Sequence, residues 1–364
     1  MNCNCKIVIN NLRYNSNHRS KINTMESLCD KKAIEKAIQE ELHDSTVNDP
    51  TCPREIDNLD IKALVKRLKS ERAKFSKNPK CNDDGFAVIF SLDNDDTSLI
   101  TRSIQEDQIL KTRLKLKQRG RMITLSSFWE LWFKNDGRLK KHILASKNPN
   151  EAKWEMQRRF SYKIATTFMP GYAKAIYEYF GAKCVLDPCA GWGDRFIGAL
   201  ASKCVEKYVG FDPNRNLRPG YVQLAKAFNQ ECVQLSTNAL KFSNESEIRT
   251  EPFESGVLQL EDDLFDLVFT SPPFFDYEMY YDQNPMYSNW IDEFYKPLII
   301  QSCRCVKPGG NVAIYVGDTS AGAIEYFMLH TVMKITSLKF VHMIAFTGIK
   351  SNKLRGIWVY EKIN

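Results

Sequence analysis

Three short stretches of this sequence carry residue types that could do chemistry. Asp187-Pro-Cys-Ala-Gly-Trp-Gly193 joins a carboxylate to a glycine turn, and Asp212 follows that turn by about twenty residues. Farther along, an apolar run leads directly into Ser271-Pro-Pro-Phe274. Consecutive prolines cannot donate ladder hydrogen bonds, so a strand must end there and the chain must turn. Such a turn is either an ordinary strand end or a substrate-binding corner at the carboxyl end of a parallel strand.

The glycine turn lies between an expected strand at 183–187 and an expected helix at 194–201. Such a turn exposes backbone N–H groups and a helix N-terminus to a ligand. It is not a dinucleotide-binding fingerprint, because Phe196 replaces the third glycine and Asp187 would repel a pyrophosphate. Asp212 ends the next expected strand, where it can accept hydrogen bonds from both hydroxyls of a ribose. A ligand with a positive charge at one end and a ribose at the other is S-adenosylmethionine, which we predict as the cofactor.

The order of these motifs resembles that in the class I S-adenosylmethionine-dependent amino-methyltransferases that make N4-methylcytosine or N6-methyladenine in nucleic acids. The resemblance covers about residues 165–364. It includes Phe168-Met-Pro170, at the place of a cofactor-clamping motif, and Lys307-Pro-Gly-Gly310, a turn widespread in class I methyltransferases. The implied fold is α/β, a Rossmann-like class I methyltransferase sheet that is parallel with an antiparallel edge hairpin.

The resemblance implies a cofactor-binding role for nine residues: Phe168, Pro170, Asp187, Pro188, Ala190, Gly191, Gly193, Asp212 and Asn238. In this interpretation the two glycines let the backbone approach the methionine part of the cofactor, and Asp187 lies near its amino group. Asp212 holds the ribose. Asn238 is assigned to the adenine ring because it follows the expected third strand at 232–235.

The catalytic residues implied by the resemblance are Ser271, Pro272, Pro273 and Phe274. An exocyclic amine on a base is a poor nucleophile because its lone pair is delocalised into the ring. The Ser271 hydroxyl and the Pro272 carbonyl would accept its N–H groups and aim the lone pair at the methyl group. Phe274 would stack on the base, which must be flipped out of a duplex or already single-stranded.

The sequence leaves open which base is methylated and whether the nucleic acid is DNA or RNA. Ser271 is typical of the cytosine-N4 subgroup, although that subgroup usually has Tyr where Phe274 stands, and Cys189 replaces a common Phe. Related motifs occur in RNA and cap methyltransferases, so DNA is favoured over RNA only slightly. An alternative of another class is a non-catalytic nucleic-acid-binding subunit with the same fold. The intact motifs disfavour it.

The net charge of +7 has its main source between Lys111 and Lys163, where fifteen basic residues face four acidic ones. From 111 to 121 every odd position is basic. On a strand these side chains would share one face, whereas on a helix they would surround it. We predict contacts with nucleic-acid phosphates, against an ordinary solvated surface as the alternative, from Lys115, Lys117, Arg119, Arg121, Arg158 and Arg159.

The sequence predicts three regions: a flexible tail at 1–25, a mainly helical basic domain at 26–165 and a methyltransferase domain at 166–364. Helices are expected at 26–43 and 56–75, and a short strand at 86–90. From residue 166 onwards strands and helices alternate, as in a mostly parallel sheet. The acidic stretch 243–263 is expected to be a surface insertion. Two strands near the end, at 339–346 and 356–362, are expected to form the antiparallel edge pair.

Composition sets the remaining expectations. The hydrophobic fraction is 43%, which suffices for a buried core, and no run approaches the roughly 18 apolar residues of a membrane helix. We therefore expect an intracellular protein, cytoplasmic or nuclear, without a membrane partner. The eleven cysteines form no C-x2-C pair and no cluster with histidine, so no metal site is predicted. The oligomeric state is left open.

Overall fold

In the computed structural model the chain divides into two compact units, residues 1–53 and residues 54–364. The described residues, all in the second unit, are 56, 59–77, 86–92, 96–118, 121–124, 126–133, 137–149, 152, 165, 167–273, 278–279, 291–316, 323–348 and 351–363. The tail expected at 1–25 and the helix expected at 26–43 lie outside the described residues.

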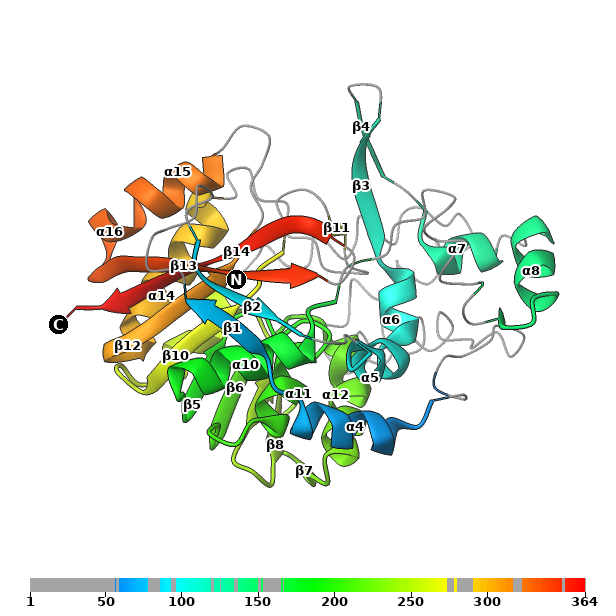
Figure 1. Ribbon diagram of the computed structural model, residues 1–364, viewed down its shortest axis with the longest axis horizontal. Helices are drawn as coiled ribbons and strands as arrows, with labels where there is room; N and C mark the ends of the chain where they lie inside the picture. The colour runs from blue at the N-terminus through cyan, green and yellow to red at the C-terminus, as the bar shows by residue number, and fades with distance from the viewer. Residues whose placement is uncertain are drawn as a thin grey trace, which may run out of the picture. The chain divides into compact units, whose positions relative to one another are not determined.

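Most strands of the described residues form one eleven-stranded sheet, shown in Figure 1, in the order β1-β2-β13-β14-β12-β10-β5-β6-β9-β8-β7. In chain order these strands are β1 (Lys74–Lys77), β2 (Phe86–Ser91), β5 (Cys184–Asp187), β6 (Lys207–Phe211), β7 (Cys232–Gln234), β8 (Ala239–Phe242), β9 (Glu247–Arg249), β10 (Phe265–Thr270), β12 (Val306–Tyr315), β13 (Leu338–Gly348) and β14 (Ser351–Lys362).

The helices of the described residues follow the same chain order. They are α4 (Ile61–Ser70), α5 (Ser98–Ile104), α6 (Glu106–Lys111), α7 (Phe128–Phe133), α8 (Gly137–Leu144), α10 (Pro170–Phe180), α11 (Asp194–Ala201), α12 (Arg218–Ala227), α13 (Phe253–Gly256), α14 (Lys296–Cys305), α15 (Ala323–His330) and α16 (Val332–Ile335), with single turns η2 (Arg215–Leu217), η3 (Val257–Gln259) and η4 (Ile291–Tyr295). Among them no helix is both long and apolar enough to cross a membrane.

The centre of the sheet is parallel. β9, β6, β5, β10 and β12 run side by side in one direction. Such strands are covered on both faces, which is why β6 and β10 are almost wholly buried and read as continuous apolar runs. With β14 antiparallel between β12 and β13, this order confirms the predicted α/β fold with a Rossmann-like, mostly parallel sheet and an antiparallel pair of strands.

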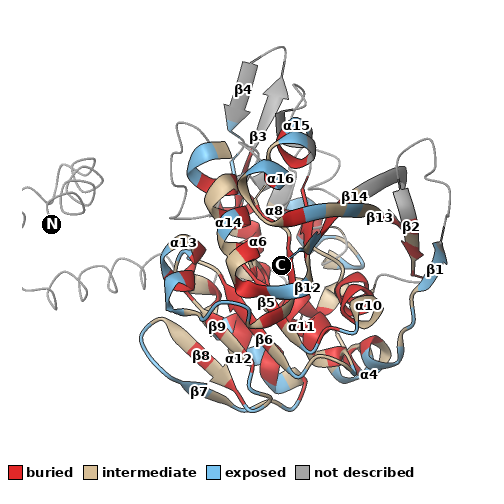
Figure 2. Ribbon diagram, turned by 90° about the vertical axis from the view of Figure 1, so that its left-hand side faces the viewer, coloured by how far each residue is buried: buried red, intermediate tan, exposed pale blue. Residues whose placement is uncertain are grey.

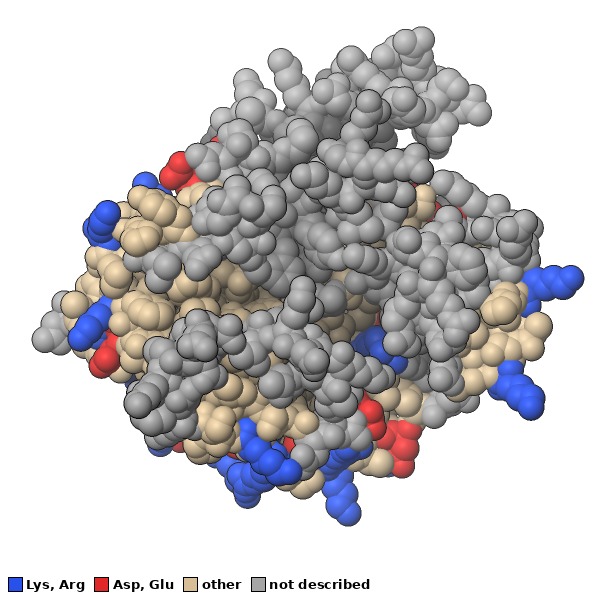
Figure 3. All heavy atoms as spheres, turned by 45° about the horizontal axis from the view of Figure 1, so that its top comes forward, with Lys and Arg blue, Asp and Glu red and all other residues tan. Residues whose placement is uncertain are grey.

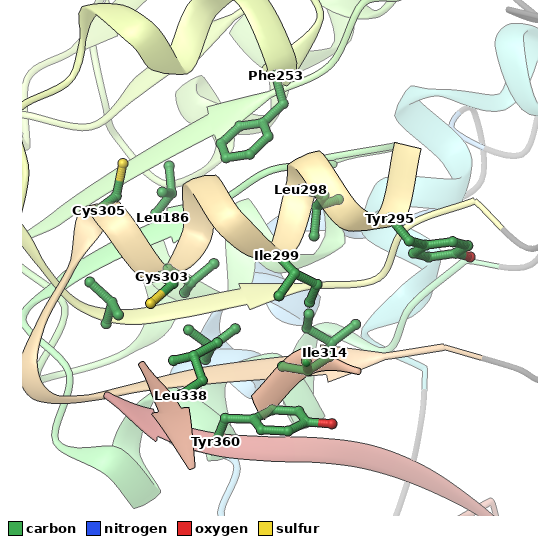
Figure 4. Packing of buried hydrophobic residues seen from close by; sticks show 14 of the residues in the cluster. Leu186, Phe253, Tyr295, Leu298, Ile299, Cys303, Cys305, Ile314, Leu338 and Tyr360 are labelled. Atoms are coloured by element: carbon green, nitrogen blue, oxygen red, sulfur yellow. The ribbon is translucent and has the colours of Figure 1, made fainter. Parts of the chain in front are cut away.

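Helices cover both faces of the sheet. In Figure 2, α13 and α14 lie on one side of the central strands, and α10 and α4 lie on the other. The core beneath α14 is aliphatic and aromatic: Figure 4 shows Leu298, Ile299 and Cys303 of this helix among Leu186 of β5 and Ile314 of β12. All but Cys303 are at most 1% exposed, so the central strands are held firmly and can position groups at their ends.

The antiparallel pair near the end of the chain is confirmed as β13 and β14, but two further strands lie beyond it. β14 pairs with β12, and the outer side of β13 pairs in parallel with β2, which in turn pairs with β1. The strand expected at 86–90 is therefore present, and it belongs to the large sheet. The helix expected at 56–75 is shorter, since α4 ends at Ser70 and β1 follows.

The stretch 243–263 is not a surface insertion, as the sequence had suggested. It contains β9, which pairs in parallel with β6, and Ile248 at its centre is completely buried. The flanking Glu247 and Arg249 form an ion pair of 2.7 Å with each other. A single apolar residue between two charges gives almost no periodic signal, so this three-residue strand was hidden.

The basic stretch forms strands, which settles the choice between helix and strand. β3 (Arg113–Gln118) and β4 (Arg121–Thr124) make a hairpin, and β11 (Glu278–Met279) adds to it by pairing with β3. Figure 1 shows this hairpin standing away from the large sheet. β11 begins five residues after Pro273, so the hairpin is joined through backbone hydrogen bonds to the chain that leaves the proline corner.

Candidate active site

The carboxyl ends of three adjacent parallel strands bring the predicted site residues together. β5 ends at Asp187, β6 is followed by Asp212, and β10 is followed by Ser271. These strands are neighbours in the order β10-β5-β6, with Asp187 paired in register with Gly210. In open α/β sheets ligands bind outside this edge, so the three residues occupy the expected position for a site.

Asp187 is completely buried, and both of its oxygens are occupied by donors from the protein. Arg195 Nε and Tyr208 OH each donate to Oδ2 at 2.7 Å. Thr270 Oγ1 donates to Oδ1 at 2.8 Å, and the Cys189 N–H donates to the same oxygen at 3.2 Å. The carboxylate thus ties β5, β6, β10 and α11 together.

The electrostatics of this cluster are those of a closed ion pair. Burial alone would lower the pKa of Arg195, yet the adjacent Asp187 raises it above its ordinary value. Burial and the same carboxylate raise the pKa of Tyr208 well above its ordinary value, so its hydroxyl stays a donor. Arg195 compensates the charge of Asp187, and the carboxylate has little capacity left for a cofactor ammonium.

The glycine turn uses its backbone groups internally, which corrects the expectation that they are exposed to a ligand. Gly191 has φ +58° and donates its N–H to Asp212 Oδ2 at 3.0 Å, while Tyr221 OH donates to its carbonyl. The N–H of the buried Ala190 goes to Phe211 O at 2.7 Å. These bonds occupy the N–H groups of Ala190 and Gly191, which a phosphate cradle in this turn would need.

Gly193 is required at its position for two reasons. Its φ of +98° is a conformation that side chains with a Cβ rarely adopt, and a Cβ there would lie 2.6 Å from Leu224 Cδ1. Gly193 is the N-cap of α11, so this close approach seats α11 on α12. Pro188, before the turn, is buried. The roles of these residues toward the cofactor stay predictions.

Asp212 retains acceptor capacity. Its carboxylate accepts the N–H of Gly191 on one oxygen and that of Asn214, at 2.8 Å, on the other. Asp212 is half-buried. Burial of its carboxyl raises the pKa to about 7, although the two N–H donors lower it. Each oxygen has a lone pair that ribose hydroxyls could use, and such donors would favour the charged form.

Phe168 and Pro170 lie at the entrance to α10. The Phe168 ring packs edge-on against Phe269, Tyr315 and Phe346, with centroids 5.6 to 5.7 Å apart, and the Arg195 guanidinium lies 5.6 Å from its centre. Pro170 is buried as the first residue of α10, where a missing N–H costs nothing. Phe168 therefore connects the Asp187 cluster to the ends of β10 and β12. Its clamping role stays a prediction.

The proline corner is fixed in place from two directions. Thr270, the last residue of β10, holds Asp187 and also accepts the Cys189 N–H at 3.1 Å. The buried Tyr295 donates its hydroxyl to Pro273 O at 2.9 Å. The Ser271 hydroxyl and the Pro272 carbonyl form no hydrogen bond with any described residue. Phe274 lies outside the described residues.

Asn238 was assigned on a wrong premise, because the third parallel strand is β9 and not the strand at 232–234. Asn238 lies in the turn between β7 and β8. It nevertheless reaches the end of β9, since Thr250 donates its N–H to Asn238 O at 2.6 Å. Asn238 Oδ1 is buried without a hydrogen-bond partner in the described part of the chain. Its contact with adenine stays a prediction.

The side chains of the predicted phosphate contacts lie outside the described part of the chain. Arg119, Arg158 and Arg159 lie outside the described residues, and for Lys115, Lys117 and Arg121 only the backbone is described. On the face in Figure 3 the described Lys and Arg side chains are scattered, most of them near the outline. Within the described residues no group of three or more His, Cys, Asp or Glu side chains could hold a metal ion.

Several residues of the site were missed by sequence reasoning: Arg195, Tyr208, Thr270 and Tyr295. Only Arg195 left a signal, since Asp194 and Arg195 open an otherwise apolar helix immediately after the glycine turn. A charged pair in such a place has to be matched by buried partners.

A comparison with protein-family models finds no match for this sequence, and one with curated proteins finds none either. Among solved structures, TrmN from Thermus thermophilus is 14% identical with a TM-score of 0.37, over 57% of this chain and 53% of that one. An rRNA methylase from Streptococcus thermophilus is 11% identical with a TM-score of 0.36, over 55% and 100%. A Pyrococcus horikoshii protein in complex with S-adenosyl-L-methionine is 12% identical with a TM-score of 0.38, over 54% and 57%. Likenesses this slight carry no function to this chain.

Proposed function

We propose that this protein transfers a methyl group from S-adenosylmethionine to an exocyclic amino group of a nucleic-acid base. The observation that carries the proposal is the proline corner. The Pro273 carbonyl accepts a hydrogen bond from the Tyr295 hydroxyl. The Ser271 hydroxyl and the Pro272 carbonyl have no hydrogen-bond partner among the described residues. Two neighbouring acceptors at the carboxyl end of a central strand fit the two N–H groups of an amine.

The proline corner would act by positioning the amine of the base. Bound cofactor supplies an electrophilic methyl group. Ser271 and Pro272 accept the N–H bonds of the amine and turn its lone pair out of conjugation with the ring. Tyr295 and Thr270 hold the corner so that this geometry exists before the substrate binds.

The cofactor fits the donor and acceptor groups at the strand ends. Asp212 has oxygens suited to ribose hydroxyls. The glycine turn offers no free phosphate cradle in its described N–H groups, which favours a nucleoside without phosphates over a dinucleotide. Asp212 could hold the cofactor through hydrogen bonds, and Gly191 and Gly193, which have no Cβ, could let the backbone approach it closely.

Nucleic acid as the substrate is supported by the link between the basic hairpin and the corner. β11 pairs with β3, with Glu278 opposite Leu114 and Met279 opposite Arg113. A nucleic-acid strand bound to the hairpin would therefore contact an element that is hydrogen-bonded, through β11, to the chain that follows Pro273. DNA and RNA fit this arrangement equally, and we keep the slight preference for DNA that the sequence motifs indicate.

The decisive experiment identifies the product. The protein is incubated with S-adenosylmethionine labelled in its methyl group and with separate pools of single- and double-stranded DNA and RNA, which are then digested to nucleosides. We expect N4-methylcytosine or N6-methyladenine, in DNA first. The same modification in RNA alone would replace DNA as the substrate. Label on protein alone would overturn the proposal, and failure to bind the cofactor in calorimetry would favour the non-catalytic subunit.

The phosphate contacts give a prediction that depends on salt. Reversing the charge at Lys115, Lys117 and Arg121 to Glu should weaken nucleic-acid binding. On duplex DNA it should also reduce the slope of log affinity against log salt by roughly 0.9 for each phosphate that the protein no longer neutralises. The measurement is fluorescence anisotropy with a labelled oligonucleotide at several salt concentrations.

A matched control reverses Lys62, Lys66 and Lys334, which are exposed on α4 and α16. This variant has the same net charge, so it reports the effect of total charge alone. Equal loss of affinity in both triple variants, or none in the first, would refute the hairpin contacts.

A further inference from the structure

Helix α8 and the turn that follows it carry a positive charge that their own sequence does not balance. The stretch 137–148 has no acidic residue, and its basic residues are Arg138, Lys140, Lys141, His142 and Lys147. A helix macrodipole favours positive charge in the last turn and disfavours it in the first. Arg138 and Lys140 lie in the first turn of α8, so the macrodipole does not account for this composition.

The described side chains of α8 divide into a buried and an exposed set. Ile143 is completely buried, and the Lys140 ammonium lies 5.0 Å from the centre of the buried Trp132 ring of α7. Lys141 and Lys147 are exposed, and neither forms an ion pair with a described residue. Their ammonium groups therefore face solvent without a carboxylate from the described part of the chain to neutralise them.

Helix α7 supports both α8 and the basic hairpin. It begins with a capping box, in which the Glu130 N–H donates to Ser127 Oγ at 3.2 Å and the Ser127 N–H donates to Glu130 Oε2 at 2.8 Å. Arg113 of β3 donates its Nε to the same carboxylate oxygen at 3.0 Å. α7 thus holds β3 through Glu130 and α8 through Trp132, so the two basic elements are attached to one short helix.

The exposed surface of α8 fits a polyanion better than a lipid membrane. A basic helix that binds a lipid surface inserts an apolar face into it. In α8 the apolar Ile143 is already buried in the protein, and Leu144 is the one exposed large apolar side chain among those described. Lysine binds phosphate as a point charge and carries no base preference. The chemistry of this surface is therefore that of a contact with a sugar–phosphate backbone.

We infer that Lys141 and Lys147 bind backbone phosphates of the same nucleic-acid chain whose target base enters the proline corner. The inference rests on the proposed function, since it extends the binding of that substrate to a second surface beside the hairpin. None of its residues belongs to the alternating basic stretch of β3 and β4. Because both elements are attached to α7, a chain bound to the hairpin would meet α8 at a high effective concentration.

The test reverses the charge of Lys141 and Lys147 to Glu. Affinity for a labelled single-stranded oligonucleotide should fall by about tenfold or more at low salt, and the slope of log affinity against log salt should decrease by roughly 0.7 for each lost phosphate contact. In methyl transfer the KM for nucleic acid should rise and kcat should stay unchanged, because α8 does not touch the base. The matched control has the same net charge and reverses the exposed Lys62 and Lys66 of α4.

The outcomes separate the two proposals. If the unmodified protein binds no nucleic acid, the proposed function fails with its substrate. If it binds and the α8 variant loses no more affinity than the α4 variant, the inference about α8 fails alone. The inference also fails if the α8 variant keeps its affinity for the oligonucleotide and loses binding to vesicles of phosphatidylserine and phosphatidylcholine. A lower kcat at unchanged KM would overturn it as well.

A measurement on the unmodified protein guards against a variant that does not fold. A lysine whose ammonium is bound to a phosphate reacts more slowly with an acylating reagent, and mass spectrometry identifies each acylated lysine. Saturating oligonucleotide should protect Lys141 and Lys147 and leave Lys62 reactive. Protection of none of the three, or equal protection of all three, would refute the contact.

Discussion

Replacing Asp187 with alanine is expected to lower the free energy of unfolding by about 3–5 kcal/mol. The physical reason is the set of donors that would lose their acceptor. Arg195 is 4% exposed, and its charge would stay buried without a counter-ion. The hydroxyls of Tyr208 and Thr270 would lose their acceptor as well. The measurement is urea unfolding followed by circular dichroism, with the slope checked for a constant value.

A matched control and a compensating variant make this prediction specific. Glu206→Ala removes an ion pair of 2.9 Å with Lys183 in which both side chains are about two-thirds exposed, and it should leave the midpoint nearly unchanged. Adding Arg195→Met to Asp187→Ala removes the stranded charge and should recover part of the loss. If Asp187→Ala unfolds at the same urea concentration as Glu206→Ala, the buried cluster does not stabilise the site.

Ser271→Ala is expected to reduce the rate of methyl transfer by about 10²-fold or more, with the affinity for S-adenosylmethionine unchanged. The hydroxyl would act only on the amine, and its contribution would be largest when the nitrogen becomes pyramidal. Single-turnover kinetics with saturating cofactor would measure the rate, and calorimetry would measure cofactor binding. This split between rate and affinity separates a role in catalysis from a general loss of structure.

The control for this variant is Ser70→Ala, at the end of α4, where the hydroxyl donates to the Arg67 carbonyl on an exposed surface. It should change neither quantity. A Ser271→Ala protein that retains the full rate would show that the corner is only a strand end. Equal losses in rate and cofactor affinity would place the serine in the cofactor site instead.

The choice between an ordinary strand end and a substrate-binding corner depended on the surroundings of the prolines. Alone, Pro272 and Pro273 require only that β10 ends. The structure adds the donation from Tyr295 to Pro273, 22 residues away, which immobilises one carbonyl and leaves its neighbour without a described partner. A corner held in this way is pre-organised, which an ordinary turn does not need.

The central part of the fold could be read from the sequence because its signals are local. A strand buried on both faces is a short apolar run, as at 265–270, and a glycine or proline marks its end. Helix ends are marked locally as well, by Gly181, with φ +60° after α10, and by Gly193, before α11. These local signals determined the alternation of strands and helices, the fold class, and the placing of Asp187, Asp212 and Ser271 at strand ends.

Only the tertiary structure decided what those residues do to one another. Whether Asp187 is open or saturated depends on Tyr208 and Thr270, which lie 21 and 83 residues away and reach it because β5 lies between β6 and β10. Strand order decides this, and no spacing along the chain encodes it. The sequence by itself thus determined which groups stand at the site, while the packing of distant segments decided that the Asp187 carboxylate is closed by donors from the protein.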